Sequence, residues 1–380
     1  MNRFHYIVAG AGCAGLSFLV RLLQTGQFSD KKILLIDHSL KNANDRTWCF
    51  WEKTPGLFDA VVYKQWQHLW LCDHAHVRLY DIAPYTYKMI RGIDFYQYCL
   101  EFIRKYPNVI IEQATIQRME NTHNGAVLET NGQLYEADHI FSSILLQKPV
   151  LKKGQYHLLQ HFKGWVIETQ EAVFNPAEAT LMDFRVSQEQ GTAFVYVMPF
   201  TPHRALVEYT LFSDSTLRSE EYDAGLKNYI HTFLNTSNYT VQEEEFGVIP
   251  MTNYRFPSSD GAITYMGTAG GQTKASSGYT FQFIQKQTAQ LVDAILRNVK
   301  PVIDTSLLQR RFHWYDSILL NVLAKNKLPG AVIFTTLFNK NEIRDVLQFL
   351  DNETSLLQEI KIITVLPKRI FLRAALEQLT

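Results

Sequence analysis

Residues 4–15 read FHYIVAGAGCAG, an apolar strand that runs directly into a glycine-rich turn. Residues 32–37, KILLID, are a second apolar run, and it ends in Asp37 about 20 residues after the turn. A strand, a G-x-G-x-x-G turn, a helix and a second strand with a terminal acid make up the βαβ unit that binds dinucleotides. We therefore predict a dinucleotide-binding fold at the start of the chain.

Each residue of this turn has a physical role in the prediction. Gly10 permits the tight turn, and Gly15 lets the following helix pack closely on the strand. Gly12 lets the backbone, Ala11 included, approach a pyrophosphate. The helix N-terminus offers unpaired N–H groups to the phosphates, and Asp37 can accept hydrogen bonds from a ribose. The alternative is a glycine-rich turn that packs a helix without a ligand.

Composition narrows the possible classes of protein. The chain has 380 residues, which is longer than one ordinary domain. Lys+Arg and Asp+Glu both total 37, so no overall field attracts nucleic acid. The four cysteines form no C-x-x-C pair, which argues for a reducing compartment and against a disulfide framework. No uncharged apolar run is long enough to span a bilayer, and the strand at the N-terminus leaves no room for a cleaved signal.

Local patterns predict an α/β chain in three parts. Residues 65–80 alternate loosely, and residues 164–250 are strand-rich with one helix near residues 220–234. A long helix is expected over residues 277–297, and the chain after Pro301 is expected to be mostly helical. We predict a Rossmann-type domain, an inserted antiparallel sheet domain and a helical C-terminal unit. Their residue ranges are 1–60, 90–150 and 255–298 for the first, 61–89 and 151–254 for the second, and 299–380 for the third.

Aromatic and basic residues follow the second strand. Residues 45–51 read DRTWCFW, and Trp48 and Trp51 can wall a flavin or an apolar substrate. The alternative is a loop that its aromatic rings anchor in the core. Arg46 and Arg91 can make forked hydrogen bonds to phosphate, although a surface ion pair is the commoner use of arginine.

A second glycine cluster, MGTAGGQTKASSGY at residues 266–279, follows a predicted strand and opens the long helix. Its backbone N–H groups would again point at a ligand, so Gly267, Thr268, Gly278 and Tyr279 are candidate cofactor contacts. The alternative is a flexible loop that closes a domain.

Glu208 is the sharpest single candidate for chemistry. It lies in ALVEYTLF, residues 205–212, where both faces of the predicted strand are mainly apolar. A buried carboxyl group has a raised pKa and keeps its proton near neutral pH. The alternatives are an ion pair with Arg204 and an exposed position at a sheet edge.

Two other polar groups carry no site in our interpretation. Glu243, Glu244 and Glu245 are most simply a solvated acidic patch. His74 and His76 have a spacing that can ligate a metal, but a solvated polar face is the better interpretation. We therefore predict no metal site.

Taken together, these motifs resemble the bacterial lycopene β-cyclases, flavoproteins of carotenoid biosynthesis. The glycine turn at residues 10–15 is generic to flavin and nicotinamide proteins, whereas the combination of the other motifs is specific. The likeness covers nearly the whole chain. It includes Thr-Trp-x-x-Trp at residues 47–51, Pro199, Glu-Tyr-Thr at 208–210, the glycines at 267–271, Ser-Gly-Tyr-Thr at 277–280, and FLD at 349–351.

The resemblance implies a Rossmann-type FAD-binding domain with an inserted antiparallel β-sheet substrate domain and a helical C-terminal unit. It implies FAD in the reduced form, supplied with electrons by NAD(P)H, and an isomerisation without net redox change. A proton adds to a terminal double bond of lycopene, the carbocation closes a ring, and proton loss gives a β-ring. Glu208 matches the acidic motif as proton donor, with Trp48, Trp51, Tyr196 and Thr210 as expected substrate-pocket residues.

One departure concerns the second glycine cluster. Many related flavoproteins carry Gly-Asp there, whereas this chain has Gly267-Thr268, which can hydrogen-bond but carries no charge.

Lycopene is a hydrocarbon that partitions into lipid, so the resemblance also implies collection of the substrate from a bilayer. Residues 328–338 and 360–373 combine apolar groups with Lys and Arg, which suits an interfacial contact; the alternative is inward-packing amphipathic helices. We expect a cytoplasmic enzyme that associates peripherally with the cytoplasmic membrane.

Two other functions remain open at this point. The first is an FAD-dependent monooxygenase or prenyl-chain reductase on the same scaffold. The second is a non-catalytic nucleotide-binding membrane adaptor.

Overall fold

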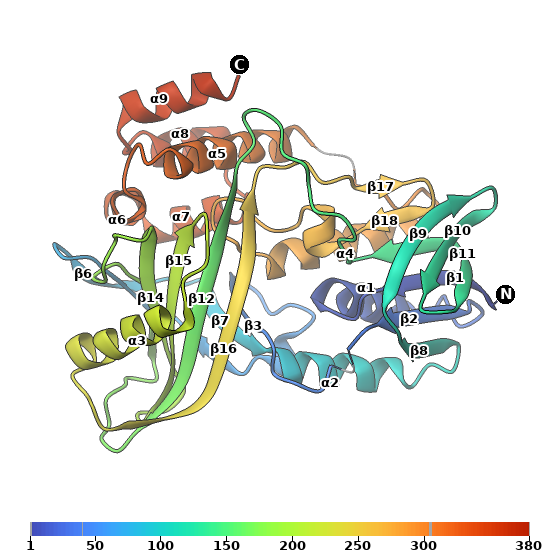
Figure 1. Cartoon of the computed structure of the whole chain (residues 1–380), viewed down its shortest axis with the longest axis horizontal. Helices are drawn as coiled ribbons and strands as arrows, with labels where there is room; N and C mark the ends of the chain where they lie inside the picture. Colours follow the sequence, from blue (N-terminus) through green and yellow to red (C-terminus); the bar gives the residue numbers. More distant parts are fainter. Residues whose placement is uncertain (1, 40, 304–305, 380) are drawn as a thin grey trace.

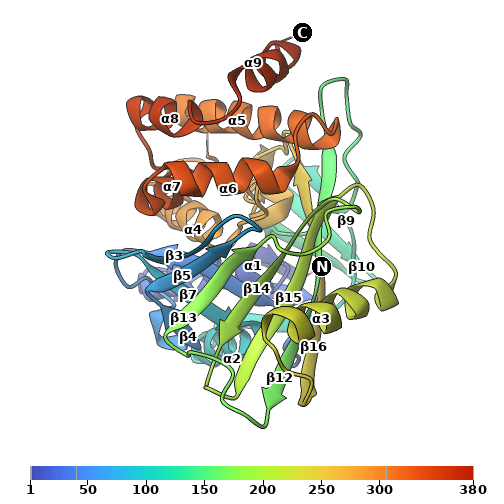
Figure 2. The same ribbon diagram turned by 90° about the vertical axis from the view of Figure 1, so that its left-hand side faces the viewer.

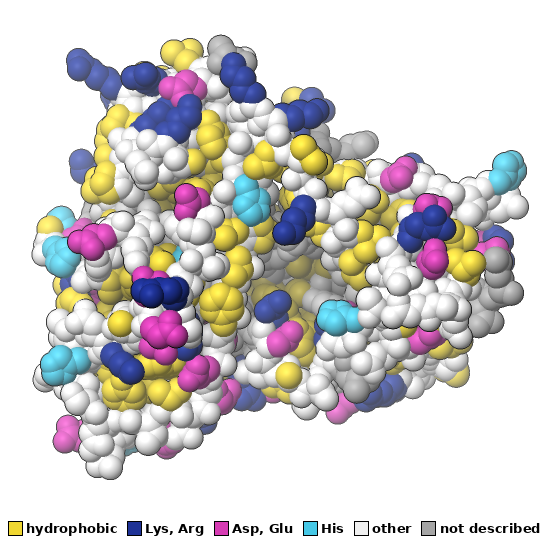
Figure 3. Space-filling view, in the orientation of Figure 1, with side chains coloured by type: hydrophobic (Ala, Val, Ile, Leu, Met, Phe, Trp, Pro, Cys, Tyr) yellow, Lys and Arg dark blue, Asp and Glu magenta, His cyan; other side chains and the backbone are white. Residues whose placement is uncertain are grey.

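The chain folds into three β-sheets and a helical end, as seen in the computed structural model, which describes residues 2–39, 41–303 and 306–379 (Figure 1). The first two sheets are large, and the face of the molecule in Figure 3 is hollowed between them. This arrangement confirms the α/β class that the sequence predicts.

The first large sheet has eight strands and contains the N-terminal βαβ unit. Its main strands run in the order β17-β18-β11-β1-β2-β8, and β10 pairs with β11 and β9. The pairs β18–β11, β11–β1, β1–β2 and β2–β8 are parallel, as in a dinucleotide-binding fold. The strands are β1 (Asn2–Ala9), β2 (Ile33–Asp37), β8 (Val109–Gln113), β9 (Ile116–Thr122), β10 (Gly125–Thr130), β11 (Leu134–Ser142), β17 (Ser259–Asp260) and β18 (Ile263–Tyr265).

Both faces of this sheet are covered, which explains why its strands read as continuous apolar runs. On β1, Val8 points to the helices α1 (Cys13–Gln24), α2 (Gly92–Ile103) and α4 (Phe281–Leu296). Its neighbours Ile7 and Ala9 point to the other side, where the hairpin β9–β10 covers the sheet. The hairpin predicted at Asn131-Gly132 joins β10 to β11.

The second large sheet has seven strands in the order β16-β12-β15-β14-β13-β5-β6. It is not purely antiparallel as predicted, because β13 and β5, which come from distant parts of the chain, pair in parallel. The strands are β5 (His68–Cys72), β6 (Val77–Asp81), β12 (His157–Thr169), β13 (Glu178–Asp183), β14 (Thr192–Pro199), β15 (Arg204–Ser213) and β16 (Tyr239–Thr252). The predicted helical insert is α3 (Ser219–Phe233), and it packs on one face of this sheet.

The third sheet is small and joins the two large ones. It has the order β3-β7-β4, with β3 (Thr47–Glu52), β4 (Lys64–Trp66) and β7 (Thr86–Arg91), and the short turn η1 (Asp59–Val61) lies between β3 and β4. Residues 61–89 therefore do not all join the second large sheet, because only β5 and β6 of that range belong to it.

The C-terminal region is helical, as predicted. It consists of α5 (Leu307–Ala324), α6 (Gly330–Lys340), α7 (Ile343–Leu350), α8 (Leu356–Ile363) and α9 (Lys368–Glu377). In Figure 2, α6 and α7 lie above the sheets, α5 and α8 lie above α6 and α7, and α9 is outermost. Within the described part of the chain, every helix is too short or too polar to cross a membrane.

Helix α6 corrects one expectation about the membrane. Residues 328–338 pack inward: Phe334 stacks on Phe184, which directly follows β13, and lies edge-on to Phe212 of β15 in the second large sheet. This segment is the ordinary amphipathic helix that the sequence left as the alternative.

Candidate active site

The first glycine turn has the geometry of a phosphate-binding loop. Gly10 has a φ of +101°, and a Cβ there would collide with the side chain of Ser143. A Cβ on Gly15 would overlap the carbonyl oxygen of Gly10, so α1 packs on the turn in the way that the sequence predicts. Gly12 differs, because it caps α1 and open space lies in front of its Cα. A pyrophosphate in that space would meet the unpaired N–H groups of α1.

Asp37 ends β2 and is almost fully buried beside this turn. Its Oδ2 accepts a hydrogen bond from the backbone nitrogen of Ala11 at 2.7 Å. Its Oδ1 accepts one from the Ser39 backbone nitrogen at 2.8 Å and lies 3.2 Å from the Nζ of Lys41. Asp37 therefore fixes the turn, and its contact with a ribose stays a prediction.

The two candidate arginines have different surroundings. Arg91 forms a two-bond ion pair with Asp94, at 2.7 and 2.9 Å, and its guanidinium lies 4.1 Å from the ring centre of Tyr63. Arg46 is exposed, and its Nη1 donates to the carbonyl oxygen of Asp45. Arg91 thus has the ion-pair role that the sequence left as the alternative, while Arg46 forms no salt bridge with a carboxylate of the described residues.

The second glycine cluster lies against the first. Gly267 opens the short turn η2 (Gly267–Gly270) with a φ of +59°, and a Cβ on it would lie 2.9 Å from the Cβ of Ala14 in α1. The Thr268 hydroxyl lies 3.1 Å from that of Thr273. The two glycine turns therefore border one region, although the predicted helix start is wrong: α4 begins at Phe281 because Gly278, at a φ of +71°, interrupts helical geometry.

Unpaired buried polar atoms gather around this second cluster. They are the Oε1 of Gln160, the hydroxyl of Ser277 and the hydroxyl of Tyr279. Buried polar atoms without partners are rare in native proteins, and they mark places where a ligand or water supplies the missing hydrogen bond. Together with the open space at Gly12, they show that the residues of both turns fit a bound dinucleotide.

Glu208 lies in the middle of β15 and is 7% exposed. Every residue of β15 between its two ends is buried, which confirms the predicted apolar environment. Arg204 pairs with Glu243 instead, at 2.8 Å, so the alternative of a Glu208–Arg204 pair is wrong. The hydroxyl of Thr210 donates to the Oε1 of Glu208 at 2.7 Å.

A second acid, Glu245, reaches toward Glu208 across a glycine. In the register of the sheet, Glu208 is opposite Gly164 of β12, and Gly164 is opposite Glu245 of β16. A Cβ on Gly164 would lie 2.9 Å from the Cγ and 3.0 Å from the Oε1 of Glu245. The absence of a side chain at Gly164 therefore makes room for the Glu245 carboxyl group on the face that carries Glu208.

The sequence interpretation of Glu245 as part of a solvated patch is wrong. Its Oε2 accepts a hydrogen bond from the hydroxyl of Thr47 at 2.7 Å, and its Oε1 is buried without a partner. Glu243 and Glu244 are exposed, as expected. The sequence signal for the inward position of Glu245 is Gly164. This glycine lies within β12 and is directly opposite Glu245 of β16.

The two acids control each other's ionisation. Burial raises the pKa of Glu208 well above its usual range, and the neighbouring Glu245 carboxylate raises it further. Burial also raises the pKa of Glu245, but the hydrogen bonds that this group accepts lower it. Of the two acids, Glu208 is therefore the one whose neutral form burial and its neighbour favour more strongly.

Aromatic side chains surround Glu208 on the side of the second glycine cluster. Tyr196 is directly opposite Glu208 on β14, and the charge of Glu208 raises the pKa of the Tyr196 hydroxyl beyond the effect of burial and of Tyr279. Tyr279 lies 4.7 Å from Trp51, ring centre to ring centre, in an edge-on contact. The structure thus brings the predicted residues Glu208, Thr210, Tyr196, Tyr279 and Trp51 together.

Trp48 does not share this pocket. Side chains alternate along β3, so Trp48 and Trp51, three residues apart, point to opposite faces. Trp48 packs on Phe95, Tyr96 and Phe281 in the core of the first domain, at ring distances of 5.2–6.2 Å. It is the core anchor that the sequence left as the alternative.

Asp351 is a further titratable group that the sequence did not single out for chemistry. It is 8% exposed and lines a cavity of about 10 Å³ with Cys49, Trp51 and Tyr279. Burial raises its pKa to about 7. A second cavity, lined by Glu245, Leu206 and Arg91, has about 30 Å³, which is enough for about one water molecule.

Comparison with solved structures shows which known fold the chain has. The fold is similar to a geranylgeranyl bacteriochlorophyll reductase-like protein from Thermoplasma acidophilum, with a TM-score of 0.66, 12% identity and coverage of 98% of this chain and 96% of the other. It is also similar to a flavoprotein/dehydrogenase from Cytophaga hutchinsonii, with a TM-score of 0.65, 12% identity and coverage of 100% and 99%. A p-nitrophenol 4-monooxygenase from Pseudomonas putida is similar with a TM-score of 0.61 and 12% identity, and the match covers 98% of this chain and 99% of the other. The chain therefore has the FAD-binding fold of flavoprotein monooxygenases and reductases.

The family is more specific than the fold. The model of the lycopene cyclase protein family matches residues 6–376, and the chain belongs to this family. A lycopene β-cyclase of Paracoccus sp. is 33% identical over 94 residues, which are 24% of this chain and 23% of that protein. An FAD-binding monooxygenase of Emericella variicolor is 41% identical over 68 residues, or 17% and 10% of the two chains. These aligned segments span less than a quarter of either curated relative.

Proposed function

We propose that this protein is a lycopene β-cyclase that converts the acyclic ends of lycopene to β-rings with FAD in the reduced form. The observation that carries the proposal is the burial of Glu208, which raises its pKa, in a chain of the lycopene cyclase family. A neutral carboxyl group in an apolar site is the group that can protonate a carbon–carbon double bond.

The proposed reaction conserves all atoms of the substrate. Glu208 gives its proton to the terminal double bond of the acyclic end, and a carbocation forms. A second double bond of the same end attacks this cation, and the new carbon–carbon bond closes the ring. Loss of one proton from the ring then gives the β-ring, so the product is an isomer of the substrate. General acid catalysis of this kind contributes roughly 10²–10⁴-fold.

Glu245 has a supporting role in this scheme. Its carboxylate, held by Thr47 and placed over Gly164, keeps the proton on Glu208 until the substrate arrives. Because Glu245 also lines the small cavity with Arg91, it is the group through which Glu208 regains a proton from water.

The aromatic side chains stabilise the positive charge. Tyr196, Tyr279 and Trp51 present ring faces and edges next to the acid, and a cation over an aromatic face gains about 0.5–2 kcal/mol. Burial keeps water from capturing the carbocation before the ring closes.

The residues that would hold FAD are those of the two glycine turns. Gly12 would face the pyrophosphate on the turn that Gly10, Ala11 and Asp37 shape, Asp37 would meet the ribose, and Gly267, Thr268 and Gly278 would hold the other end. When bound and reduced, the flavin supplies negative charge to a site where positive charge develops. NAD(P)H is the proposed source of its electrons.

Expression in a lycopene-producing bacterium tests the proposal. The wild-type chain is expected to convert the red pigment to an orange product of unchanged mass, and Glu208→Gln is expected to bind FAD without forming that product. Thr288→Ser, a small change at a buried position far along α4, serves as the matched control and is expected to keep activity. A fully active Glu208→Gln variant would remove Glu208 from the mechanism.

A second function has some support in the comparisons. The chain is similar to FAD-binding monooxygenases and to a reductase-like protein, so an oxidation or a reduction on this fold is the alternative. Either reaction would change the product mass by oxygen or hydrogen and consume NAD(P)H in proportion to product.

A further inference from the structure

The last two helices expose large apolar side chains on the side that faces away from the protein, although Ile362 and Ala374 pack inward. Among their side chains, Leu356, Leu357 and Ile360 of α8 are 50%, 80% and 51% exposed, and Leu372, Leu376 and Leu379 in and after α9 are 64%, 65% and 71% exposed. We refer to these six residues as the α8–α9 face. An ordinary surface helix puts such residues inside and its charges outside.

The acids of both helices are turned toward the protein. Glu359 of α8 has no exposed surface, and Arg311 of α5 donates two hydrogen bonds to it at 2.6 and 2.7 Å. The hydroxyl of Tyr315 adds a third at 3.0 Å. These contacts fix the orientation of α8, so its leucines point outward because the polar side of the helix is bound to α5.

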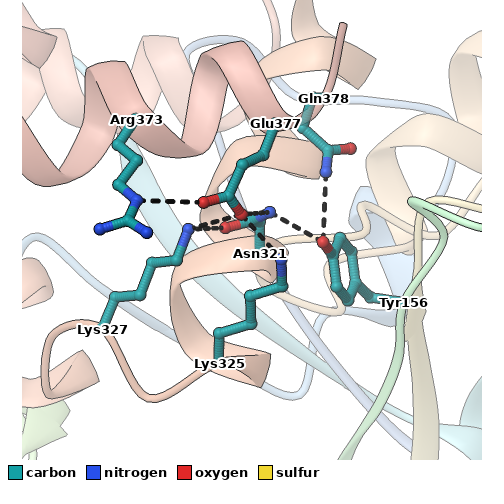
Figure 4. Close-up of polar contacts among 7 residues, drawn as sticks. All are labelled: Tyr156, Asn321, Lys325, Lys327, Arg373, Glu377 and Gln378. Carbon is teal, nitrogen blue, oxygen red and sulfur yellow. Dashed lines mark hydrogen bonds and ion pairs between the residues drawn. The ribbon is translucent and has the colours of Figure 1, made fainter. Parts of the chain in front are cut away.

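Helix α9 is fixed by a second network, shown in Figure 4. The Oε2 of Glu377 accepts hydrogen bonds from Lys325 at 2.7 Å, Lys327 at 2.8 Å and Asn321 at 3.2 Å. Asn321 also donates to the hydroxyl of Tyr156, at 2.7 Å. The lysines lower the pKa of Glu377 to about 2, so the network stays intact at neutral pH. The i, i+4, i+7 row of leucines at 372, 376 and 379 is therefore held outward.

The charge on this end of the chain is positive. Residues 355–379 contain Lys361, Lys368, Arg369 and Arg373, while their only acids are Glu359 and Glu377. Cations of α5 and of the loop after it neutralise both acids. Arg373 also pairs with Glu377 and Lys361 with Asp345, each at 3.4 Å, which leaves Lys368 and Arg369. Lys368 and Arg369 are exposed, and within the described residues they form no ion pair. Basic residues next to exposed leucines are complementary to anionic lipid headgroups.

We propose that the α8–α9 face docks on the surface of a lipid bilayer that contains anionic lipid, with its leucines in the interface and Lys368 and Arg369 at the headgroups. The contact is interfacial, since no helix in the described part of the chain could cross a membrane. The proposal deepens the proposed function and rests on it for the cargo, because a hydrocarbon substrate resides in the bilayer. It assigns the contact to residues 356–379 and not to α6, which is buried.

Flotation of the purified full-length protein with vesicles tests the docking without any carotenoid. We compare phosphatidylcholine vesicles with vesicles that also contain phosphatidylglycerol. The variant Leu372→Ser/Leu376→Ser/Leu379→Ser is expected to lower the bound fraction about tenfold or more. Lys368→Glu/Arg369→Glu is expected to abolish the preference for phosphatidylglycerol while weak binding remains.

A matched control replaces exposed apolar residues elsewhere. Leu134→Ser/Val241→Ser/Phe246→Ser changes side chains that are 41%, 39% and 53% exposed, and it is expected to bind vesicles like the wild type. Thermal unfolding verifies that each variant folds.

Three results would overturn the docking proposal. They are a wild type that stays free of both kinds of vesicle, a leucine variant that floats normally, and a wild-type dimer that the leucine variant dissociates in sedimentation. Conversion of lycopene in detergent micelles is measured separately, so a failure of docking and a failure of the cyclase proposal give different results.

Discussion

Replacing Glu245 by Gln tests whether the neighbouring carboxylate keeps Glu208 protonated. Gln is nearly isosteric and can still accept the hydrogen bond from Thr47, so the local packing is kept. What the variant loses is the negative charge that, after burial, raises the pKa of Glu208. The pH dependence of the reaction reports this loss, because only the protonated acid can start ring closure.

The size of the effect follows from the geometry of the sheet. Glu208 and Glu245 lie two strands apart, but Glu245 leans over Gly164 toward Glu208, so its charge and a hydrogen bond act on the Glu208 carboxyl group. In general, a charge within about 4–6 Å moves the pKa of a carboxyl group by about 1–3 units, and each unit corresponds to about 1.4 kcal/mol. Activity of Glu245→Gln should therefore decline at a lower pH than in the wild type, by about 1 unit or more.

The assay is the rate of lycopene conversion against pH with reduced FAD, with product measured by chromatography. Gly164→Ala is a companion variant that keeps both acids. Its new Cβ would lie 3.0 Å from the Glu245 Oε1 and from the Leu206 Cδ1, so the carboxyl group must withdraw. We expect a shift in the same direction and smaller. A Glu245→Gln profile that coincides with the wild type would refute the coupling of the two acids.

Four further variants test the surroundings of the site. In Gly15→Ala the new Cβ overlaps the Gly10 carbonyl oxygen, so denaturant unfolding should show the FAD-free protein destabilised by about 1–3 kcal/mol. Gly12→Ala should leave that stability unchanged and should weaken FAD binding in a titration. Equal effects of the two variants would contradict the loop geometry. Burial raises the pKa of Asp351 from 3.8 to about 7. Its ionisation therefore destabilises the folded state increasingly as pH rises from about 4 to 7. Across that range, the free energy of unfolding of Asp351→Asn should rise relative to the wild type by up to about 4 kcal/mol. A stability difference that does not change with pH would show that Asp351 ionises normally. Thr210→Val removes the hydrogen bond that lowers the pKa of Glu208, so its activity should persist to higher pH at a lower maximal rate, and a shift to lower pH would contradict the assignment.

The sequence predicts the first domain well because local chemistry determines it. The turn at Gly10 and Gly15 needs a positive φ and a close helix contact, and both requirements can be inferred from the residues alone. The environment of Glu208 is also predictable, since alternation along one strand shows that both of its faces are apolar.

What the sequence could not give depends on pairing between distant strands. Glu245 stands in a run of three acids, and only its register with Gly164 and Glu208 reveals that it leans inward. The parallel pairing of β13 with β5 is likewise a contact between distant parts of the chain. Because of it, the second large sheet contains both parallel and antiparallel pairs. The separation of Trp48 from Trp51 does not depend on distant contacts. The two residues are three positions apart on one strand, and this spacing alone places their rings on opposite faces.

The most direct test of the central claim is the product of lycopene turnover in deuterated water, compared between the wild type and Glu208→Gln. Because the proton on Glu208 exchanges with solvent, the wild type should give a product of unchanged mass in ordinary water and should add one deuteron for each ring formed in deuterated water. Glu208→Gln should retain bound FAD and give no ring. A product altered in oxygen or hydrogen count, or deuterium-labelled rings from Glu208→Gln, would contradict protonation by this acid.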